Sequence, residues 1–186
     1  MTHTHMSDVL AAELERLSNR VGRVSLDILE TGSIRNATEP HRVGDGWSTL
    51  TLATYRATYG GRFVSVDLDT SQAKKVLARE QIAGVELVQA ESVATLKECL
   101  AAGMSFDFIL LDSGDDPELI YAEYEVARQL VRVPGLIAVD DVAYHPGSYG
   151  SKGERVVPHL EAEGIDFRVS SRWGGGGNID VVLIDY

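Results

Sequence analysis

The sequence has few of the features that mark secreted or membrane proteins. Its 186 residues include a single cysteine, Cys99, so no disulfide can form within the chain and nothing requires an oxidising compartment. Apolar runs are interrupted by Asp or Glu well before the ~18 residues that a membrane span needs. Residues 1–5 lack the positive run and apolar core of a signal peptide. We therefore expect a soluble, cytoplasmic protein that does not bind membranes.

Positive charge is also scarce. Lys and Arg number 17 against 28 Asp and Glu, which gives a net charge of −11. An acidic surface repels phosphate backbones, so nucleic acid is not an expected partner. The chain contains no internal repeat and no Pro/Ser-rich linker, and its 44% hydrophobic residues are typical of a globular protein. We expect a single domain over residues 1–186, with an N-terminal tail and helix over residues 1–20.

Short apolar runs alternate with longer amphipathic segments. The runs are nearly continuous, as expected for strands that are covered on both faces; they span residues 24–30, 62–67, 85–88, 106–112 and 135–140. Helical patterns lie between them over residues 47–58, 71–80, 93–102 and 117–131. This alternation predicts an α/β sandwich with a parallel sheet and right-handed crossovers.

The C-terminal part breaks this alternation. A predicted helix over 152–163 is followed by two strand patterns, 166–171 and 179–186, separated only by the Gly-rich residues 174–178. Strands joined by so short a loop must be antiparallel. The predicted fold is a mostly parallel, seven-stranded α/β sheet with a C-terminal antiparallel hairpin. An amphipathic helix over 6–17 packs either on this sheet or against a second copy of the chain, as in a homodimer.

Acidic residues end four of the apolar runs: Glu30, Asp67, Asp112 and Asp140. Ligands of parallel sheets bind beyond the carboxyl ends of the strands, so these acids either line a pocket or simply begin loops. The two oxygens of Asp67 can accept both hydroxyls of a ribose, which fits NAD and S-adenosylmethionine equally. The compact G-x-G-x-x-G that cradles a pyrophosphate is missing. S-adenosylmethionine has no phosphate and needs no such cradle.

The order of motifs carries a family resemblance. The segments ILETGS, GDGWSTLTLA, GGRFVSVDLD, VELVQAES, FDFILLD and GLIAVDDV follow one another in this order. Together with the terminal hairpin they resemble the class I S-adenosylmethionine-dependent methyltransferases over residues 26–186, especially the O-methyltransferase branch related to catechol and caffeoyl-CoA O-methyltransferases. The resemblance implies a Rossmann-like fold and methyl transfer to a small hydroxylated acceptor.

The resemblance also implies roles for individual residues. The methionine part of the cofactor is expected at Glu30, Gly32 and Ser48, the ribose at Asp67, and the adenine at Leu68, Glu91 and Ser92. Asp112 is expected to serve both the cofactor pocket and a divalent cation, with Asp140 and Asp141 as further metal ligands. Carboxylates ~5 Å apart repel by about 3 kcal/mol at an effective dielectric of 20. A cluster of carboxylate oxygens suits Mg²⁺, Mn²⁺ or Ca²⁺, unless Asp141 points away to cap a loop.

Several positions depart from the family pattern. Asp141 stands where the family commonly has Asn, and Asp115 stands where catechol-type members have a catalytic Lys. His145 is the nearest substitute base or an additional metal ligand, unless it faces water. The insertion over 33–45 is either a lid or a surface bulge, and the Gly-rich stretch 147–153 lies where substrate would enter.

Three other functions remain open at this point. The first is a metal-independent methyltransferase, in which the acidic cluster has no cation. The second is a nicotinamide-dependent oxidoreductase, against which the missing glycine motif and the hairpin both argue. The third is a non-catalytic module that binds S-adenosylmethionine, which the missing Lys base makes plausible.

Overall fold

The computed structural model describes residues 4–38, 47–145, 148–174 and 177–186. The strands are β1 (Ile28–Thr31), β2 (Phe63–Asp67), β3 (Glu86–Gln89), β4 (Phe106–Leu111), β5 (Val131–His145), β6 (Ser148–Ser151), β7 (Phe167–Gly174) and β8 (Gly177–Asp185). The helices are α1 (Met6–Val21), α3 (Ser48–Tyr59), α4 (Ser71–Arg79), α5 (Ser92–Ala101), α6 (Pro117–Leu130) and α7 (Gly153–Glu163). Within the described residues, no helix combines the length and the apolar character needed to cross a bilayer.

The strands form one mixed sheet in the order β3-β2-β1-β4-β5-β8-β7. Strands β1 to β5 pair in parallel, whereas β8 is antiparallel to both β5 and β7. This arrangement confirms the predicted parallel sheet and its C-terminal hairpin. The sequence did not predict β6, which pairs antiparallel with the end of β5. Strand β5 is longer than the predicted 135–140, and its last residues are the ones that pair with β6.

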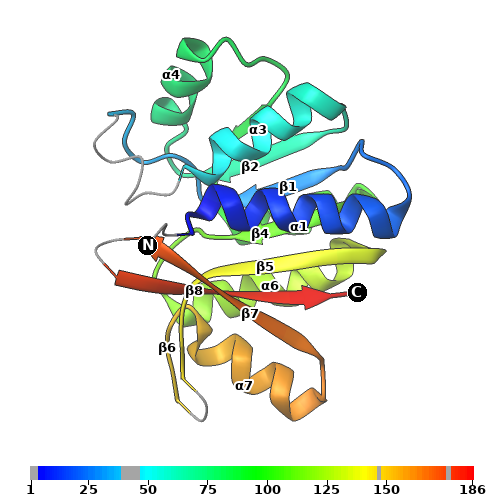
Figure 1. Ribbon diagram of the computed structural model, residues 1–186, viewed down its shortest axis with the longest axis vertical. Helices are drawn as coiled ribbons and strands as arrows, with labels where there is room; N and C mark the ends of the chain where they lie inside the picture. The colour runs from blue at the N-terminus through cyan, green and yellow to red at the C-terminus, as the bar shows by residue number, and fades with distance from the viewer. Residues whose placement is uncertain (1–3, 39–46, 146–147, 175–176) are drawn as a thin grey trace.

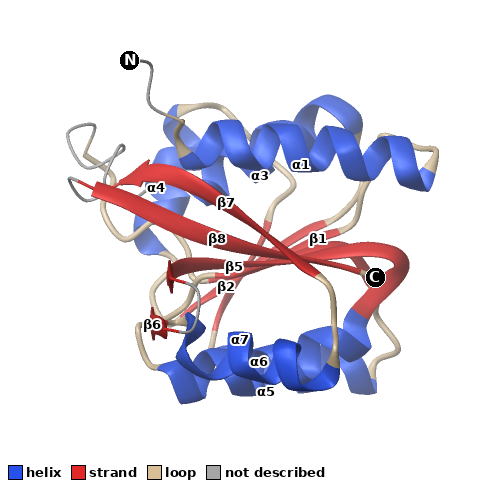
Figure 2. Cartoon of the chain, turned by 60° about the horizontal axis from the view of Figure 1, so that its bottom comes forward, coloured by secondary structure: helices blue, strands red, loops and turns tan. Residues whose placement is uncertain are grey.

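The sheet lies between two layers of helices (Figures 1 and 2). Helices α1, α3 and α4 cover one face, and α5, α6 and α7 cover the other. Both layers bury apolar side chains, and every residue of β1 and β4 is buried. Such strands need side chains that tolerate burial on both faces, which explains their continuous apolar runs.

The N-terminal helix α1 packs on the sheet. Its buried residues Met6, Leu10, Leu14 and Leu17 share one core cluster with residues of α3 and of the central strands. The apolar face of α1 is therefore covered within the chain, which agrees with the first of its two predicted placements. A homodimer remains a prediction.

The chain order places a crevice at the centre of the sheet. From β1, the next strand in sequence lies on one side as β2, and β4 lies on the other side. The helices that follow β1 and β4 lie on opposite faces of the sheet (Figure 2), so they diverge at the carboxyl ends of these strands. Ligands of open α/β sheets bind at such a switch point.

Candidate functional site

The strand register brings several of the predicted site residues to the same height along neighbouring strands of the sheet. Thr31 pairs with Val66 and with Leu111, and Leu111 pairs with Val139. The residues that follow these positions are Gly32, Asp67, Asp112 and Asp140, which therefore lie side by side along the carboxyl edge of the sheet. Three of the four acids that end apolar runs, Asp67, Asp112 and Asp140, therefore meet at one edge of the sheet, whereas Glu30 lies before this level.

Gly32 allows β1 and β4 to approach closely. Its φ is +83°, and a Cβ atom there would lie 2.1 Å from the backbone oxygen of Asp112. Its N–H donates to the carbonyl of Val66 at 2.8 Å. Only glycine combines this left-handed conformation with such a close backbone approach. Gly32 thus shapes the floor between the ends of β1, β2 and β4.

A cleft of about 150 Å³ opens beside Gly32. It is lined by Gly32, Val66, Asp67, Leu68, Glu91, Ser92, Ser113, Gly114 and Leu119. The structure therefore brings together five of the eight residues predicted to bind the cofactor. Leu68 leaves 73% of its surface exposed, although a side chain of this kind is usually covered.

The Asp67 carboxylate is held by backbone groups of the cleft. Its Oδ2 accepts the N–H of Ser33 at 2.7 Å, and its Oδ1 accepts the N–H of Asp69 at 2.9 Å. Each carboxylate oxygen has a second lone pair that can accept a further hydrogen bond. The group is thus fixed in one orientation and can still accept hydrogen bonds from two hydroxyls.

Glu30 takes a different role from the predicted one. Its side chain is completely buried and accepts hydrogen bonds from the hydroxyls of Ser48 at 2.6 Å and Ser65 at 2.7 Å. Burial raises the pKa of this carboxyl to about 8. Because this side chain is fully enclosed and is not among the residues that line the cleft or the small crevice beside it, Glu30 anchors the first residue of α3 rather than facing the methionine part of a ligand. Ser48 lies beside Asp67 and Asp112 in a small adjoining crevice.

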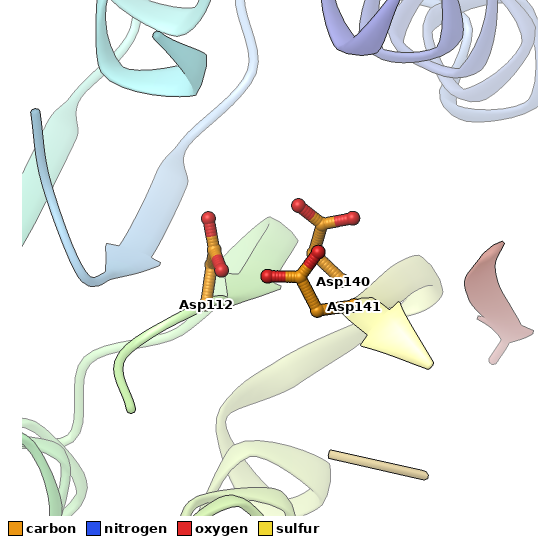
Figure 3. Close-up of side chains that lie close together, drawn as sticks. All are labelled: Asp112, Asp140 and Asp141. Carbon is orange, nitrogen blue, oxygen red and sulfur yellow. The ribbon is translucent and has the colours of Figure 1, made fainter. Parts of the chain in front are cut away.

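Asp112, Asp140 and Asp141 form an acidic cluster where β4 ends and where β5 continues past it. One carboxylate oxygen of each lies within 4.8 Å of those of the other two, and the three side chains project into the same space (Figure 3). Successive residues of a regular strand point to opposite faces. Asp141 has φ +55° and lies where the β5–β8 register shifts, so the alternation is broken. This bulge explains why Asp141 joins the cluster instead of pointing away.

Two buried cations, which the sequence analysis missed, neutralise the cluster. The Lys152 ammonium donates to Asp112 Oδ1 at 2.5 Å and to Asp141 Oδ2 at 3.3 Å. The Arg172 guanidinium donates to both oxygens of Asp140, at 2.9 and 2.5 Å, and to Asp141 Oδ1 at 3.2 Å. The side chains of Lys152 and Arg172 are only 3% and 4% exposed.

A signal for both cations was present in the sequence. Lys152 belongs to the Gly-rich stretch that was placed at the substrate entrance, and Arg172 belongs to the predicted hairpin. Three converging carboxylates need protons or positive charges, and these could have been sought among the lysines and arginines of neighbouring strands.

Burial governs the electrostatics of the cluster. It raises the pKa of Asp112 to about 7, and the negative charge of Asp140 adds to this effect. Burial alone would lower the pKa of the Lys152 ammonium, but the adjacent carboxylates, first of all Asp112, raise it above its ordinary value. Lys152 is therefore a permanent positive charge and not a base at neutral pH.

The acidic cluster does not fit a divalent cation in this arrangement. Its oxygens have the hard-donor chemistry that Mg²⁺ prefers. However, both oxygens of Asp140, both of Asp141 and Oδ1 of Asp112 already accept from Lys152 or Arg172. A metal ion would have to displace the ammonium from its two carboxylates.

A second cavity, of about 270 Å³, borders the cluster at Asp141. It is lined by Asp115, Asp141, Val142, Ala143, Ser151 and Ile179. We name this cavity the β5 groove. His145 is the last residue of β5, and its side chain lies outside the described part of the structure. Within the insertion, residues 33–38 are described, whereas 39–45 are not.

Comparisons with known proteins identify a methyltransferase domain and solved structures with the same fold. A family model described as a methyltransferase domain matches residues 42–142. Cofactor-bound Rv0187 from MTB is 25% identical, with a TM-score of 0.65 and coverage of 94% of this chain and 79% of that chain. The O-methyltransferase from Bacillus cereus in complex with SAH is 21% identical, with a TM-score of 0.64 and coverage of 94% and 79%.

A third solved structure is considerably longer than this chain. TrmN from Thermus thermophilus is 16% identical, with a TM-score of 0.61, and 95% of this chain covers 48% of TrmN. This chain thus spans about half the length of TrmN. A search among curated proteins found no match. The solved structures below 25% identity show that the fold is shared.

Proposed function

Because the chain belongs to the methyltransferase-domain family, we propose that it transfers a methyl group from S-adenosylmethionine to a hydroxyl oxygen of a small acceptor. The observation that carries this proposal is the common level of Gly32, Asp67 and Asp112. The cleft of about 150 Å³ and the crevice next to it share Gly32 and Asp67, and the crevice reaches the acidic cluster at Asp112. The acceptor hydroxyl is proposed because an O-methyltransferase shares the fold and because the sequence resembles that branch.

The cleft offers a group for each part of a nucleoside. The Asp67 carboxylate accepts hydrogen bonds from the two ribose hydroxyls, and the exposed Leu68 packs on the adenine ring. The side chains of Glu91 and Ser92 lie at the adenine edge. Gly32, together with Ser48 at the N-terminus of α3, faces the amino-acid part, where the helix dipole favours a carboxylate.

The acceptor is proposed to bind in the β5 groove. Asp141 belongs both to this groove and to the acidic cluster, while Asp112 links the cluster to the cofactor side. Methyl transfer requires sulfur, methyl carbon and acceptor oxygen in one line. The crevice on the cofactor side is lined by Asp112 and the β5 groove by Asp141, so both border the same acidic cluster. Asp112 is the catalytic carboxylate of the proposal, and His145 at the end of β5 remains the candidate base.

Calorimetric titration with S-adenosylhomocysteine tests the cofactor part. We expect stoichiometric binding to the wild-type protein and none to the Gly32→Val variant, whose side chain would occupy the floor of the cleft. Gly103→Val is the matched control, because nothing lies within 4 Å of a Cβ at that exposed glycine of positive φ. Failure of the wild-type protein to bind would refute the proposal.

Turnover tests the reaction. We expect release of S-adenosylhomocysteine when S-adenosylmethionine is incubated with a panel of phenols, hydroxy acids and sugars. Binding without turnover on any hydroxyl acceptor would favour the non-catalytic module instead. Methylation of amine acceptors alone would keep the methyltransferase and refute the hydroxyl acceptor.

A further inference from the structure

We propose, on the basis of the function proposed above, that methyl transfer by this chain needs no divalent cation, because Lys152 and Arg172 supply the positive charge of the site. The three carboxylates are then one half of a salt-bridge cluster rather than a metal centre. Four observations support this assignment: the position of the ammonium, the way it is held, the pairing of Arg172 and the charge balance.

Lys152 occupies the space between the end of β4 and the adjacent part of β5. Its Nζ lies 2.5 Å from an oxygen of Asp112 and 3.3 Å from an oxygen of Asp141. A metal ion shared by these two strands would have to lie between the same oxygens. An ammonium and a metal ion cannot both fill this space, so occupation by Lys152 excludes the cation.

The fold holds Lys152 in place. It immediately precedes α7, and the following residue, Gly153, packs so closely on β5 that a Cβ would lie 2.3 Å from Cγ1 of Val142. This contact fixes the start of α7 against the strand that carries Asp141. The Lys152 side chain is only 3% exposed, so withdrawal of the ammonium would require a new buried partner or a movement of α7.

Arg172 binds the remaining carboxylate on the other side. Its fork engages both oxygens of Asp140 and one of Asp141, which is the bidentate geometry that guanidinium groups favour. Both partners are at most 4% exposed. Asp140 is thereby paired with a buried cation, and a metal ion at its oxygens would have to compete with the Arg172 guanidinium.

The charges of the cluster nearly balance without a metal. Three carboxylates are paired with two buried cations, which leaves a net charge of only −1. Among the residues that line the β5 groove, Asp141 accepts a hydrogen bond from the Lys152 ammonium. Lys152 thus places a buried positive charge directly behind the wall of the proposed acceptor site, and this charge favours negative charge developing on an acceptor oxygen there.

Binding of Mn²⁺, followed by electron paramagnetic resonance, tests this proposal without any assay of activity. We expect the chelator-treated wild-type protein to bind no stoichiometric Mn²⁺ at millimolar concentration. The Lys152→Met variant removes the ammonium and keeps the three carboxylates, so we expect it to bind Mn²⁺ tighter than the wild type by about tenfold or more, or about 1.4 kcal/mol. Lys97→Met, a change of the same kind at an exposed position, should behave as the wild type.

Two results would overturn the proposal. One is stoichiometric Mn²⁺ binding by the wild type that is lost in Asp112→Asn. The other is turnover that is abolished by chelation and restored by Mg²⁺. Both are measured on proteins that keep Lys152, so they remain decisive if Lys152→Met does not fold. Failure of the wild type to bind S-adenosylhomocysteine would refute the proposed function but would leave the Mn²⁺ result intact, which separates the two proposals.

Discussion

The buried carboxyl of Glu30 makes the stability of the protein depend on pH in a specific direction. Its pKa rises from an ordinary 4.5 to about 8 because burial penalises the charged form. A carboxyl whose pKa is raised by folding binds its proton more tightly in the folded state. Its stabilising contribution is complete below about pH 4.5 and is lost as the pH rises through about 8.

The size of the effect follows from the two pKa values. Each factor of ten in proton affinity corresponds to about 1.4 kcal/mol, so the full span is about 5 kcal/mol. Between about pH 5.5 and pH 8, the free energy of unfolding should fall by about 3 kcal/mol through Glu30 alone. Glu30→Gln keeps the shape and the hydrogen-bonding capacity towards Ser48 and Ser65 but cannot ionise.

Urea unfolding of both proteins at several pH values measures this difference. We expect the stability of the wild type, relative to Glu30→Gln, to decrease steadily as the pH rises. Glu123, whose pKa burial also raises, titrates in both proteins and cancels in the comparison. Asp112 interacts electrostatically with Glu30, so the comparison is repeated in an Asp112→Asn background. Glu163→Gln, at an exposed position, controls for the loss of one carboxylate. A constant difference between wild type and Glu30→Gln over this range would refute the reasoning.

Three further substitutions test the site by other means. Gly32→Ala should lower the free energy of unfolding by about 3 kcal/mol or more, because its Cβ would meet a backbone oxygen at 2.1 Å. Gly164→Ala, with open space around it, should lower it by only about 1 kcal/mol. Urea denaturation measures both values, and equal losses would contradict the close approach at Gly32. Arg172→Met leaves a buried carboxylate unpaired and should lower the free energy of unfolding by about 3–5 kcal/mol in the same assay. Arg128→Met removes a half-exposed ion pair and should lower it by at most about 1 kcal/mol. Asp67→Asn should weaken the binding of S-adenosylhomocysteine by about tenfold or more in calorimetric titration, because hydrogen bonds to a charged acceptor are stronger than those to a neutral one. Unchanged affinity would show that Asp67 does not bind the ribose.

The sequence predicted the fold well because the fold depends on patterns that repeat along the chain. Continuous apolar runs identified β1 to β5, and the Gly-rich turn between two late strand patterns identified the antiparallel pair β7 and β8. The resemblance to class I S-adenosylmethionine-dependent methyltransferases was confirmed by the family match over residues 42–142. Strand β6 was missed because a stretch rich in glycine carries no apolar period.

The site was predicted less completely, for a physical reason. Residues at strand ends, such as Asp67 and Asp112, could be placed because parallel strands carry their carboxyl ends to one edge. The partners of buried charges cannot be placed in this way. Lys152 and Arg172 reach the acids through the start of a helix and the middle of a hairpin, and the two serines that enclose Glu30 come from α3 and β2. No spacing along the chain indicates these contacts.

The cluster draws its opposite charges from different portions of the polypeptide. All three acids lie within the matched residues 42–142, whereas Lys152 and Arg172 follow them in sequence, on α7 and β7. The last two strands and their preceding helix are thus more than an edge that completes the sheet. They act as an internal counterion for the part of the chain that carries the acids, so a shortened protein ending after β5 would keep every carboxylate and lose the means to keep them together.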